Sequence, residues 1–475
     1  MATDGNWDRR SLLRGAAVVA GAAAAAPLLG EATKAFADGG DADALFKAGQ
    51  FEQAGRAYEE ILKTDPGNLH AARQRGYVGL LSNKFPEAEK FLTMALKLAP
   101  DDKETNALLG DCYIRQDKYS LSVPRWEAAG EDAYAKWFAA VGGDAYEIHG
   151  DTARVPFEQT DPEPQVNASV NGGPTKPFSF YTGAGWLGMN AAVAKEAGLR
   201  SVHSVKSDFE GRIMWSHYGV LESFKLGDIE VRNIPVNWSE AESADDAPPK
   251  TNDGLIGTWL FYHLLTTFDY AGGALILRRP TSEATKKVRA NAKRAGAQPL
   301  PLWLAREQML HSRGSLTGSA GTGTAVMGVN LGGTGEIVAG MSGETSKKLG
   351  IRTDSDRPLQ TFGHGHPTVT YPCYPKEVRL GDAVANDVYC ETDPNMPINV
   401  PWPFGPGFDA IGHSPDHSRP GRRNRTARSA TPGAPGTPGG PHSRSPRRRP
   451  AQLRRDRQTR SRPRRPACSA VATCR

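Results

Sequence analysis

The run Phe178-Ser-Phe-Tyr-Thr-Gly-Ala-Gly185 is the stretch from which the fold of this chain can be worked out. Its apolar residues predict a strand, and the glycines that follow predict a tight loop. A short helix is expected next, from Ala191 to Ala197, and the apolar segment Leu255-Ile256-Gly257 lies further along. Short strands with turn residues between them continue to Leu277. Residues 165–279 are therefore expected to form one mostly-β lobe.

A second copy of this pattern follows the first. Four segments repeat in the same order: Val329–Thr334 matches Phe180–Gly185, Thr345–Ile351 matches Val193–Leu199, Leu380–Asp382 matches Leu226–Asp228, and Ala410–Gly412 matches Leu255–Gly257. The residue-number offset grows from 149 at the first pair to 155 at the last, as small loop insertions would produce. We expect two lobes on one plan, at residues 165–279 and 301–413, with a linker at residues 280–300.

The order of these segments resembles a lobe of the retropepsin-type bacterial aspartic proteases, and two such lobes in one chain resemble the pepsin-like architecture. Leu255-Ile256-Gly257 and Phe268-Asp269-Tyr270 carry the resemblance in the first lobe. In that family each lobe presents Asp-Thr-Gly on a loop. The corresponding positions here are Tyr181-Thr182-Gly183 and Asn330-Leu331-Gly332. The resemblance implies aspartic-type endopeptidase activity and a peptide ligand in a cleft between the lobes.

The residues at these two positions argue against hydrolysis. An aspartic protease uses two adjacent carboxylates that share one proton, and each lobe supplies one of them. A tyrosine has an ordinary pKa of about 10 and an asparagine does not titrate, so neither replaces a carboxylate near neutral pH. The first hypothesis is therefore a pseudo-protease that binds peptide without cutting it.

Three other hypotheses stay open at this stage. Asp253 and Asp409 stand near the apolar-Gly segments and are candidates for displaced catalytic carboxylates, although an aspartate beside a turn more often caps the local backbone. The motif positions are alternatively explained by decay, or by sequence error, in a lineage of active proteases. A non-enzymatic scaffold or adaptor is the alternative from another class.

A 34-residue period runs through residues 38–130. Phe51, Phe85 and Tyr119 keep this step, as do the pair Gly76 and Gly110. The period, with helical spacing of the apolar residues between, resembles tetratricopeptide repeats. Such repeats either offer a groove for a peptide or serve as a structural spacer, and the sequence does not choose between these two. Residues 131–164, rich in Gly and Pro, are expected to form a linker.

Both ends of the chain are predicted to lie outside the folded parts. Residues 1–37 combine Arg9-Arg10, a weakly apolar run and Ala35-Phe36-Ala37, which predicts a cleavable twin-arginine signal and export across the cytoplasmic membrane. Residues 414–475 hold 17 Arg, no Lys and two Asp, and are expected to form a disordered basic tail or an out-of-frame translation. The whole chain is thus predicted to be a multidomain protein: an α-helical array, then a mostly-β two-lobed acid-protease-like domain.

The charge distribution limits the expected partners. The net charge of +6 divides into about +15 on the tail and about −9 on residues 1–413, so no nucleic-acid partner is expected for the folded part. No membrane contact is expected for the mature protein. We expect no cofactor and no metal, since His364 and His366 lack convincing further ligands. In an oxidising compartment a bridge between Cys373 and Cys390 is one outcome to consider.

Overall fold

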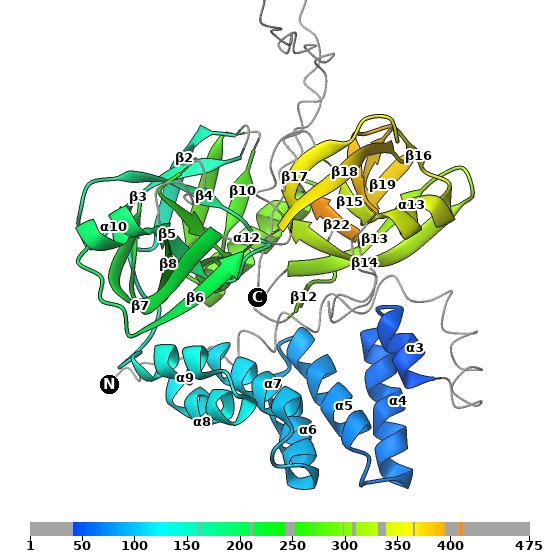
Figure 1. Cartoon of the computed structure of the whole chain (residues 1–475), viewed down its shortest axis with the longest axis horizontal. Helices are drawn as coiled ribbons and strands as arrows, with labels where there is room; N and C mark the ends of the chain where they lie inside the picture. The colour runs from blue at the N-terminus through cyan, green and yellow to red at the C-terminus, as the bar shows by residue number, and fades with distance from the viewer. Residues whose placement is uncertain are drawn as a thin grey trace, which may run out of the picture. The chain divides into compact units, whose positions relative to one another are not determined.

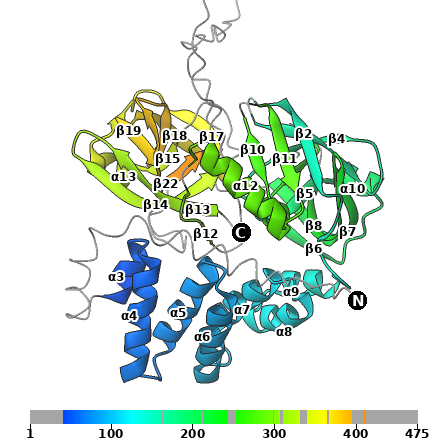
Figure 2. The ribbon, with the colours of Figure 1, turned by 180° about the vertical axis from the view of Figure 1, so that it is seen from behind.

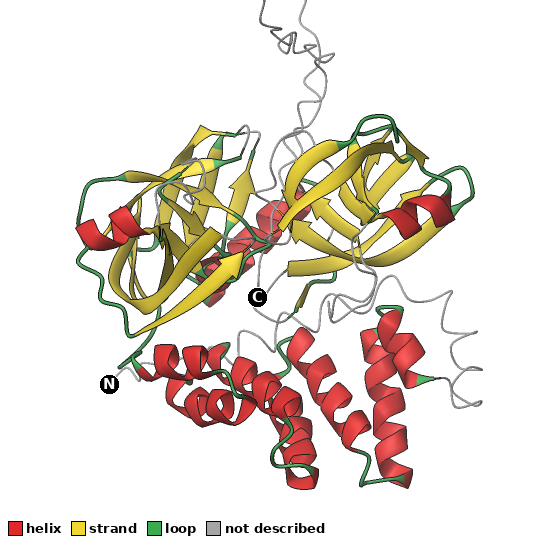
Figure 3. Cartoon of the chain, viewed as in Figure 1, coloured by secondary structure: helices red, strands yellow, loops and turns green. Residues whose placement is uncertain are grey.

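The computed structural model describes residues 41–160, 163–209, 212–242, 252–270, 272–297, 299–305, 310–330, 339–363, 366–394 and 408–411. The predicted signal at residues 1–37 and the predicted tail at 414–475 lie outside these residues. Within the described chain, a helical N-terminal part is followed by a mostly-β part (Figure 3). None of the described helices is both long and apolar enough to cross a bilayer.

The helical part is an array of successive short helices (Figure 1). These are α3 (Ala42–Lys47), α4 (Phe51–Thr64), α5 (Leu69–Leu81), α6 (Phe85–Leu98), α7 (Lys103–Ile114), α8 (Tyr119–Ala129) and α9 (Asp132–Ala139). Every residue of the predicted period has a structural role: Phe51, Phe85 and Tyr119 each begin a helix. A Cβ on Gly76 would lie 2.6 Å from Leu92, and one on Gly110 would lie 2.7 Å from a ring atom of Trp126. The 34-residue period therefore reflects close packing between consecutive helices.

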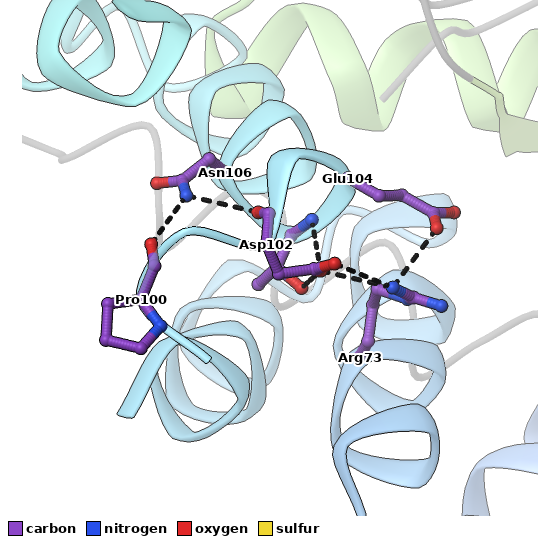
Figure 4. A network of polar contacts seen from close by, with 6 residues as sticks. Arg73, Pro100, Asp102, Glu104 and Asn106 are labelled. Atoms are coloured by element: carbon purple, nitrogen blue, oxygen red, sulfur yellow. Dashed lines mark hydrogen bonds and ion pairs between the residues drawn. The ribbon is translucent and has the colours of Figure 1, made fainter. Parts of the chain in front are cut away.

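The helix starts repeat with the same period. Asn68 caps α5 and Asp102 caps α7, each accepting a backbone N–H bond three residues on. Arg73 Nη1 lies 3.1 Å from Asp102 Oδ2 and 3.2 Å from Glu104 Oε2 (Figure 4). Burial raises the pKa of Asp102. Hydrogen bonds from Thr105 and Arg73 together lower it by more than burial raises it, so the pKa lies below its ordinary value. Ionised Asp102 thus stabilises the array.

The prediction that residues 131–164 form a linker is wrong. It holds α9 and the strands β1 (Glu147–His149) and β2 (Thr152–Gln159). The indole Nε1 of Trp137, on α9, donates to Gly219 O over 2.8 Å, and its ring packs against Trp259. The Gly and Pro residues between these short elements made the sequence look like a linker. The segment is ordered because it packs against the first lobe.

The first lobe is a closed barrel. Its strands are β3 (Gln165–Val170), β4 (Lys176–Phe180), β5 (Leu187–Asn190), β6 (His203–Phe209), β7 (Arg212–Leu226), β8 (Ile229–Ala241), β9 (Gly254–Ile256), β10 (Thr267–Asp269) and β11 (Ala274–Arg278), with helices α10 (Ala191–Glu196) and α11 (Thr258–Tyr262). The pairing order β3-β4-β9-β5-β8-β7 returns to β3 and closes the ring. Its interior is filled by large apolar side chains, among them Phe178, Phe180 and Phe224, all fully buried.

A helix, α12 (Ser282–Arg294), follows β11 where residues 280–300 were predicted to be a linker (Figure 2). That prediction was wrong because α12 buries only Val288 and so shows almost no apolar stripe in the sequence. Thr281 caps its first turn, and Lys293 and Arg294 stand in its last turn, where cations favour the helix dipole.

The second lobe repeats the first. Its strands are β12 (Trp303–Leu304), β13 (Leu310–Thr317), β14 (Thr322–Asn330), β15 (Ala339–Ser342), β16 (Arg352–Thr353), β17 (Leu359–Gly363), β18 (His366–Tyr374), β19 (Glu377–Leu380), β20 (Ala383–Asn386), β21 (Cys390–Asp393) and β22 (Phe408–Ile411), with helix α13 (Gly343–Leu349). The order β13-β14-β22-β15-β21-β18 matches β3-β4-β9-β5-β8-β7, and each neighbouring pair has the same parallel or antiparallel sense. The two lobes therefore share one topology.

The strand register defines which residues are equivalent. Phe180 pairs with Ile256 in the first lobe, and Val329 pairs with Ala410 in the second. Gly188 pairs with Leu255, and Gly340 pairs with Asp409. Ala410 therefore takes the place of Ile256, one residue away from the predicted match of Ala410 with Leu255. The residue-number offset between the lobes is therefore 154 at this segment and not the predicted 155. The prediction relied on residue similarity, whereas strand pairing sets the register.

Candidate functional site

The loop after β4 is held by backbone hydrogen bonds from the β9–α11 segment. Tyr181 N donates to Ile256 O over 3.0 Å, and Thr258 N donates to Ala184 O over 2.8 Å. The Thr258 hydroxyl also lies 3.1 Å from Thr182 O. Since β4 and β9 are parallel, their carboxyl ends meet at one edge, so loop and helix start lie together there. Thr258 was missed at the sequence level, although it directly follows Leu255-Ile256-Gly257.

Gly257 makes this meeting of loop and helix sterically feasible. A Cβ at this position would lie 2.3 Å from Trp186 O and 2.5 Å from Gly185 O, both backbone atoms that no side-chain rotation moves away. Glycine is required here for close backbone approach and not for an unusual backbone angle, since its φ is −90°. The apolar-Gly segment of the sequence therefore has a specific packing role.

A hydrogen bond joins the loop after β4 in the first lobe to the end of β14 in the second lobe. The Thr182 hydroxyl donates to Val329 O over 2.7 Å. Thr182 is fully buried and Val329 is 7% exposed, so water does not compete for this bond. Val329 also belongs to the same buried cluster as Phe180 and the rest of the first lobe's interior. The strand of one lobe thus ends against the loop of the other.

Tyr181 and Asn330 occupy equivalent places beside this bond. Tyr181 follows Phe180, and Asn330 follows Val329, which the register makes its counterpart. Tyr181 is half-buried, and its ring lies 2.7 Å from where a Cβ on Gly183 would stand. Neither residue brings a carboxylate. The remaining predicted motif residues, Leu331 and Gly332, lie outside the described residues.

Asp253 and Asp409 are not symmetric, contrary to the sequence-based hypothesis of displaced catalysis. Asp253 precedes β9, at the opposite end of that strand from the Tyr181 loop, and its Oδ1 accepts from Asn190 Nδ2 over 3.2 Å. Asp409 lies within β22, where it pairs with Gly328 and takes the place of Leu255. The Asp253 carboxylate therefore bonds the side chain of Asn190, the residue that caps α10.

Arg115, at the end of α7, connects the helical array to the start of the second lobe, at β12. Its Nη1 donates to Leu304 O over 3.0 Å and its Nη2 to Ala305 O over 2.6 Å. Nη2 also lies 2.5 Å from Asp111 Oδ2, and the Arg115 side chain is fully buried. The edge-to-face contact of Phe51 with Trp303 lies on the same segment. Sequence reasoning missed Arg115, because nothing in a helical repeat indicates which arginine is buried.

The array also contacts the first lobe through a buried histidine. His263 Nε2 lies 2.8 Å from Asp117 Oδ1, and its Nδ1 lies 2.6 Å from Trp259 O. The Tyr146 ring stacks on the imidazole at 3.7 Å between centroids. All these contacts are internal to the fold. Among the described residues, no group of three or more His, Cys, Asp or Glu side chains is placed to hold a metal ion.

Comparisons with known proteins find weak structural similarity. No protein-family model and no curated protein matches the chain. A retropepsin-like aspartic protease from Rickettsia conorii is 18% identical, with a TM-score of 0.21 over 29% of this chain and 97% of that protein. Conglutin gamma, a basic 7S globulin from lupine seeds, is 12% identical, with a TM-score of 0.33 over 57% of this chain and 90% of its own. Basic 7S globulin from soybean is 8% identical, with a TM-score of 0.29 over 56% and 90%.

Proposed function

We propose that this chain is an exported protein of the aspartic-protease type that binds an extended peptide between its lobes without cleaving it. The observation that carries the proposal is the 2.7 Å bond from the Thr182 hydroxyl to Val329 O. It brings the loop that follows β4 against the end of β14, the equivalent strand of the second lobe. A ligand in contact with both lobes would meet residues 181 and 330 at this point.

The lack of cleavage follows from the residues at the two positions. Peptide hydrolysis by a carboxylate pair needs one ionised group to take a proton from water and one protonated group to give a proton to the substrate. Tyr181 and Asn330 supply neither of these. Asp253 lies at the other end of β9 from the Tyr181 loop, where its carboxylate bonds Asn190. Decay from an active ancestor would leave the same residues and is distinguished by whether peptide binding remains.

The small residues of the first loop favour a peptide as the ligand. Ala184 is half-buried and carries only a methyl group, so another backbone can approach it closely. Affinity for an extended segment would come from main-chain hydrogen bonds, with side-chain pockets adding preference.

A second role, as an internal scaffold, is favoured for the helical array. Arg115 binds two carbonyls at the start of the second lobe, and Arg313 Nη2, also in the second lobe, donates to Gly49 O over 2.8 Å. Trp137 holds the first lobe through Gly219. Of the two roles predicted for the repeats, these contacts favour the spacer, which would hold both lobes in register for a shared ligand.

The experiment compares peptide binding and cleavage in the full chain and two variants. The first variant carries Tyr181→Asp with Asn330→Asp, and the second carries Tyr181→Asn alone. The second variant has two amides where the first has two carboxylates, so shape is matched and only the acid differs. A fluorescent peptide library is followed by anisotropy for binding and by mass spectrometry for cleavage, at acidic and neutral pH.

We expect the unmodified chain and the Tyr181→Asn variant to bind selected peptides and cut none. We expect the double aspartate variant to cut the bound peptides at acidic pH, where the pair holds one proton. Cleavage by the unmodified chain would overturn the proposal. So would the absence of any bound peptide, which would favour decay or a purely structural scaffold.

A further inference from the structure

Two buried cysteines of the second lobe stand directly opposite each other. Cys373 in β18 and Cys390 in β21 are register partners on neighbouring antiparallel strands. Both side chains are fully buried, and both are thiols in this structure. Opposed residues of antiparallel strands have Cα atoms about 4.5–5.5 Å apart. This spacing lies inside the range of about 4.4–6.8 Å that a disulfide spans, so a bond needs no movement of the backbone.

The strands that carry these cysteines are weakly joined otherwise. Among the described residues, the β18–β21 ladder has three register pairs: Tyr371–Thr392, Pro372–Glu391 and Cys373–Cys390. The equivalent ladder of the first lobe, β7–β8, is much longer and runs from Met214–Ala241 to Leu226–Ile229. The strand pair that carries the two cysteines therefore has fewer cross-strand pairs to hold it than its counterpart in the first lobe.

The equivalent positions in the first lobe carry no cysteine. Gly188 and Gly340 are equivalent, so their neighbours in register make Val236 the counterpart of Cys390. Gly219, the partner of Val236, is then the counterpart of Cys373. The second lobe's buried cluster is also small, and it contains both cysteines: Leu316, Met327, Ala339, Met341, Leu349, Ile351, Cys373, Val378 and Cys390. A lobe with a small core gains most from a covalent link.

We propose that Cys373 and Cys390 are a disulfide site that closes the second lobe after the protein reaches an oxidising compartment. The oxidant is a donor that carries a disulfide bond and becomes a dithiol, or two thiols, when reduced. The thiolate of one cysteine attacks the donor's S–S bond, which breaks, and one donor sulfur leaves as a thiol. The second cysteine then attacks the mixed disulfide, forms the Sγ–Sγ bond and releases the other donor thiol. The two cysteines lose two electrons and two protons, and the donor gains them.

Burial decides when this exchange takes place. It raises the pKa of the Cys390 thiol to about 12 and moves that of Cys373 the same way, so the reactive thiolate is scarce in the folded lobe. Exchange therefore requires β18 and β21 to separate. The bond forms while the lobe folds or opens, and it then resists reduction until the lobe unfolds.

The test uses the full chain refolded in oxidised and reduced glutathione. Free thiols are blocked after denaturation, and tryptic peptides are mapped, since cleavage after Lys376 and Arg379 separates the two cysteines. We expect a linked pair of peptides that carry Cys373 and Cys390, and a blocked thiol at Cys112. Cys112 is the matched control, because it is also fully buried but lies on helix α7. Reductant added to the folded protein should leave the link intact, whereas reductant with denaturant should remove it.

A second measurement compares the thermal midpoint of unfolding of the unmodified chain with that of a variant without the two cysteines. Reduction under denaturing conditions followed by refolding should lower the thermal midpoint of the unmodified chain and leave that of a Cys373→Ala, Cys390→Ala variant unchanged. The proposal is overturned if both cysteines are recovered as blocked thiols from the oxidised sample. It is equally overturned if either one is linked to Cys112, Cys468 or Cys474 in preference to its cross-strand partner.

Discussion

The bond between the lobes predicts the effect of replacing Thr182 by valine. Valine has nearly the same shape but no hydroxyl, so Val329 O loses the donor that stands 2.7 Å away. Thr182 is fully buried and Val329 almost so, and water cannot replace the lost donor. An orphaned buried acceptor costs about 1–3 kcal/mol, so Thr182→Val should lower the free energy of unfolding by that amount. Urea unfolding followed by tryptophan fluorescence measures it.

Thr182→Ser separates the hydrogen bond from packing. Serine keeps the hydroxyl and loses one methyl group, which costs about 1 kcal/mol when buried. Hydrogen exchange at the β14 amides adds a local readout, and exchange there should be faster in Thr182→Val than in Thr182→Ser. The reasoning is refuted if Thr182→Val changes the free energy of unfolding by less than about 0.5 kcal/mol, the range of ordinary surface changes. Equal destabilisation by the two variants would also refute it.

Three further changes test the contacts that position the loops. Gly257→Ala places a methyl group against two backbone oxygens and should cost about 3 kcal/mol in thermal unfolding, at the upper end of overpacking effects. Arg115→Met leaves Asp111 as an unpaired buried carboxylate and should cost about 3–5 kcal/mol in urea unfolding. Asp102→Asn keeps the helix cap but loses the ion pair with Arg73. Because the folded pKa of Asp102 lies below its ordinary value of 3.8, the stability difference from the unmodified chain should persist above that pH and vanish as pH falls through the folded pKa.

Each of these has a control. Gly142→Ala should be neutral, since nothing lies within 4 Å of a Cβ there, and equal losses at Gly257 and Gly142 would contradict the steric argument. Adding Asp111→Asn to Arg115→Met should recover part of the loss, and no recovery would argue against a buried ion pair. A stability difference for Asp102→Asn that stays constant down to pH 2 would show that charge plays no part.

The sequence predicts the shared plan of the lobes because their turns are chemically marked. Gly227 and Gly381 both adopt positive φ, at 58° and 60°, in the turns that the Leu-Gly-Asp segments predict. Helices α10 and α13 both begin after a capping residue, Asn190 or Ser342. Features of this kind are local, so a single sequence displays them.

Other parts of the structure depend on contacts that no local pattern shows. The match of Ala410 was off by one residue because β22 is positioned by β14 and β15 and not by its own composition. Helix α9 was not predicted, because the packing of Trp137 on Trp259 of the first lobe joins residues that lie far apart in the sequence. The long strand β7 has two counterparts, β18 and β19, because Pro375 interrupts the ladder between them.

The proximity of residues 181 and 330 is measured most directly by crosslinking. The chain carries Tyr181→Cys and Asn330→Cys, with Cys468→Ser and Cys474→Ser, and reacts with a short bis-maleimide. The control pairs Tyr181→Cys with Thr322→Cys, since Thr322 begins β14 and stands roughly 26 Å along the strand from residue 330. If residues 181 and 330 lie together as the Thr182–Val329 bond requires, the first pair crosslinks within one molecule in high yield and the control does not. Equal yields for both pairs, or crosslinks only between molecules, would contradict the placement of the two loops and with it the proposed function.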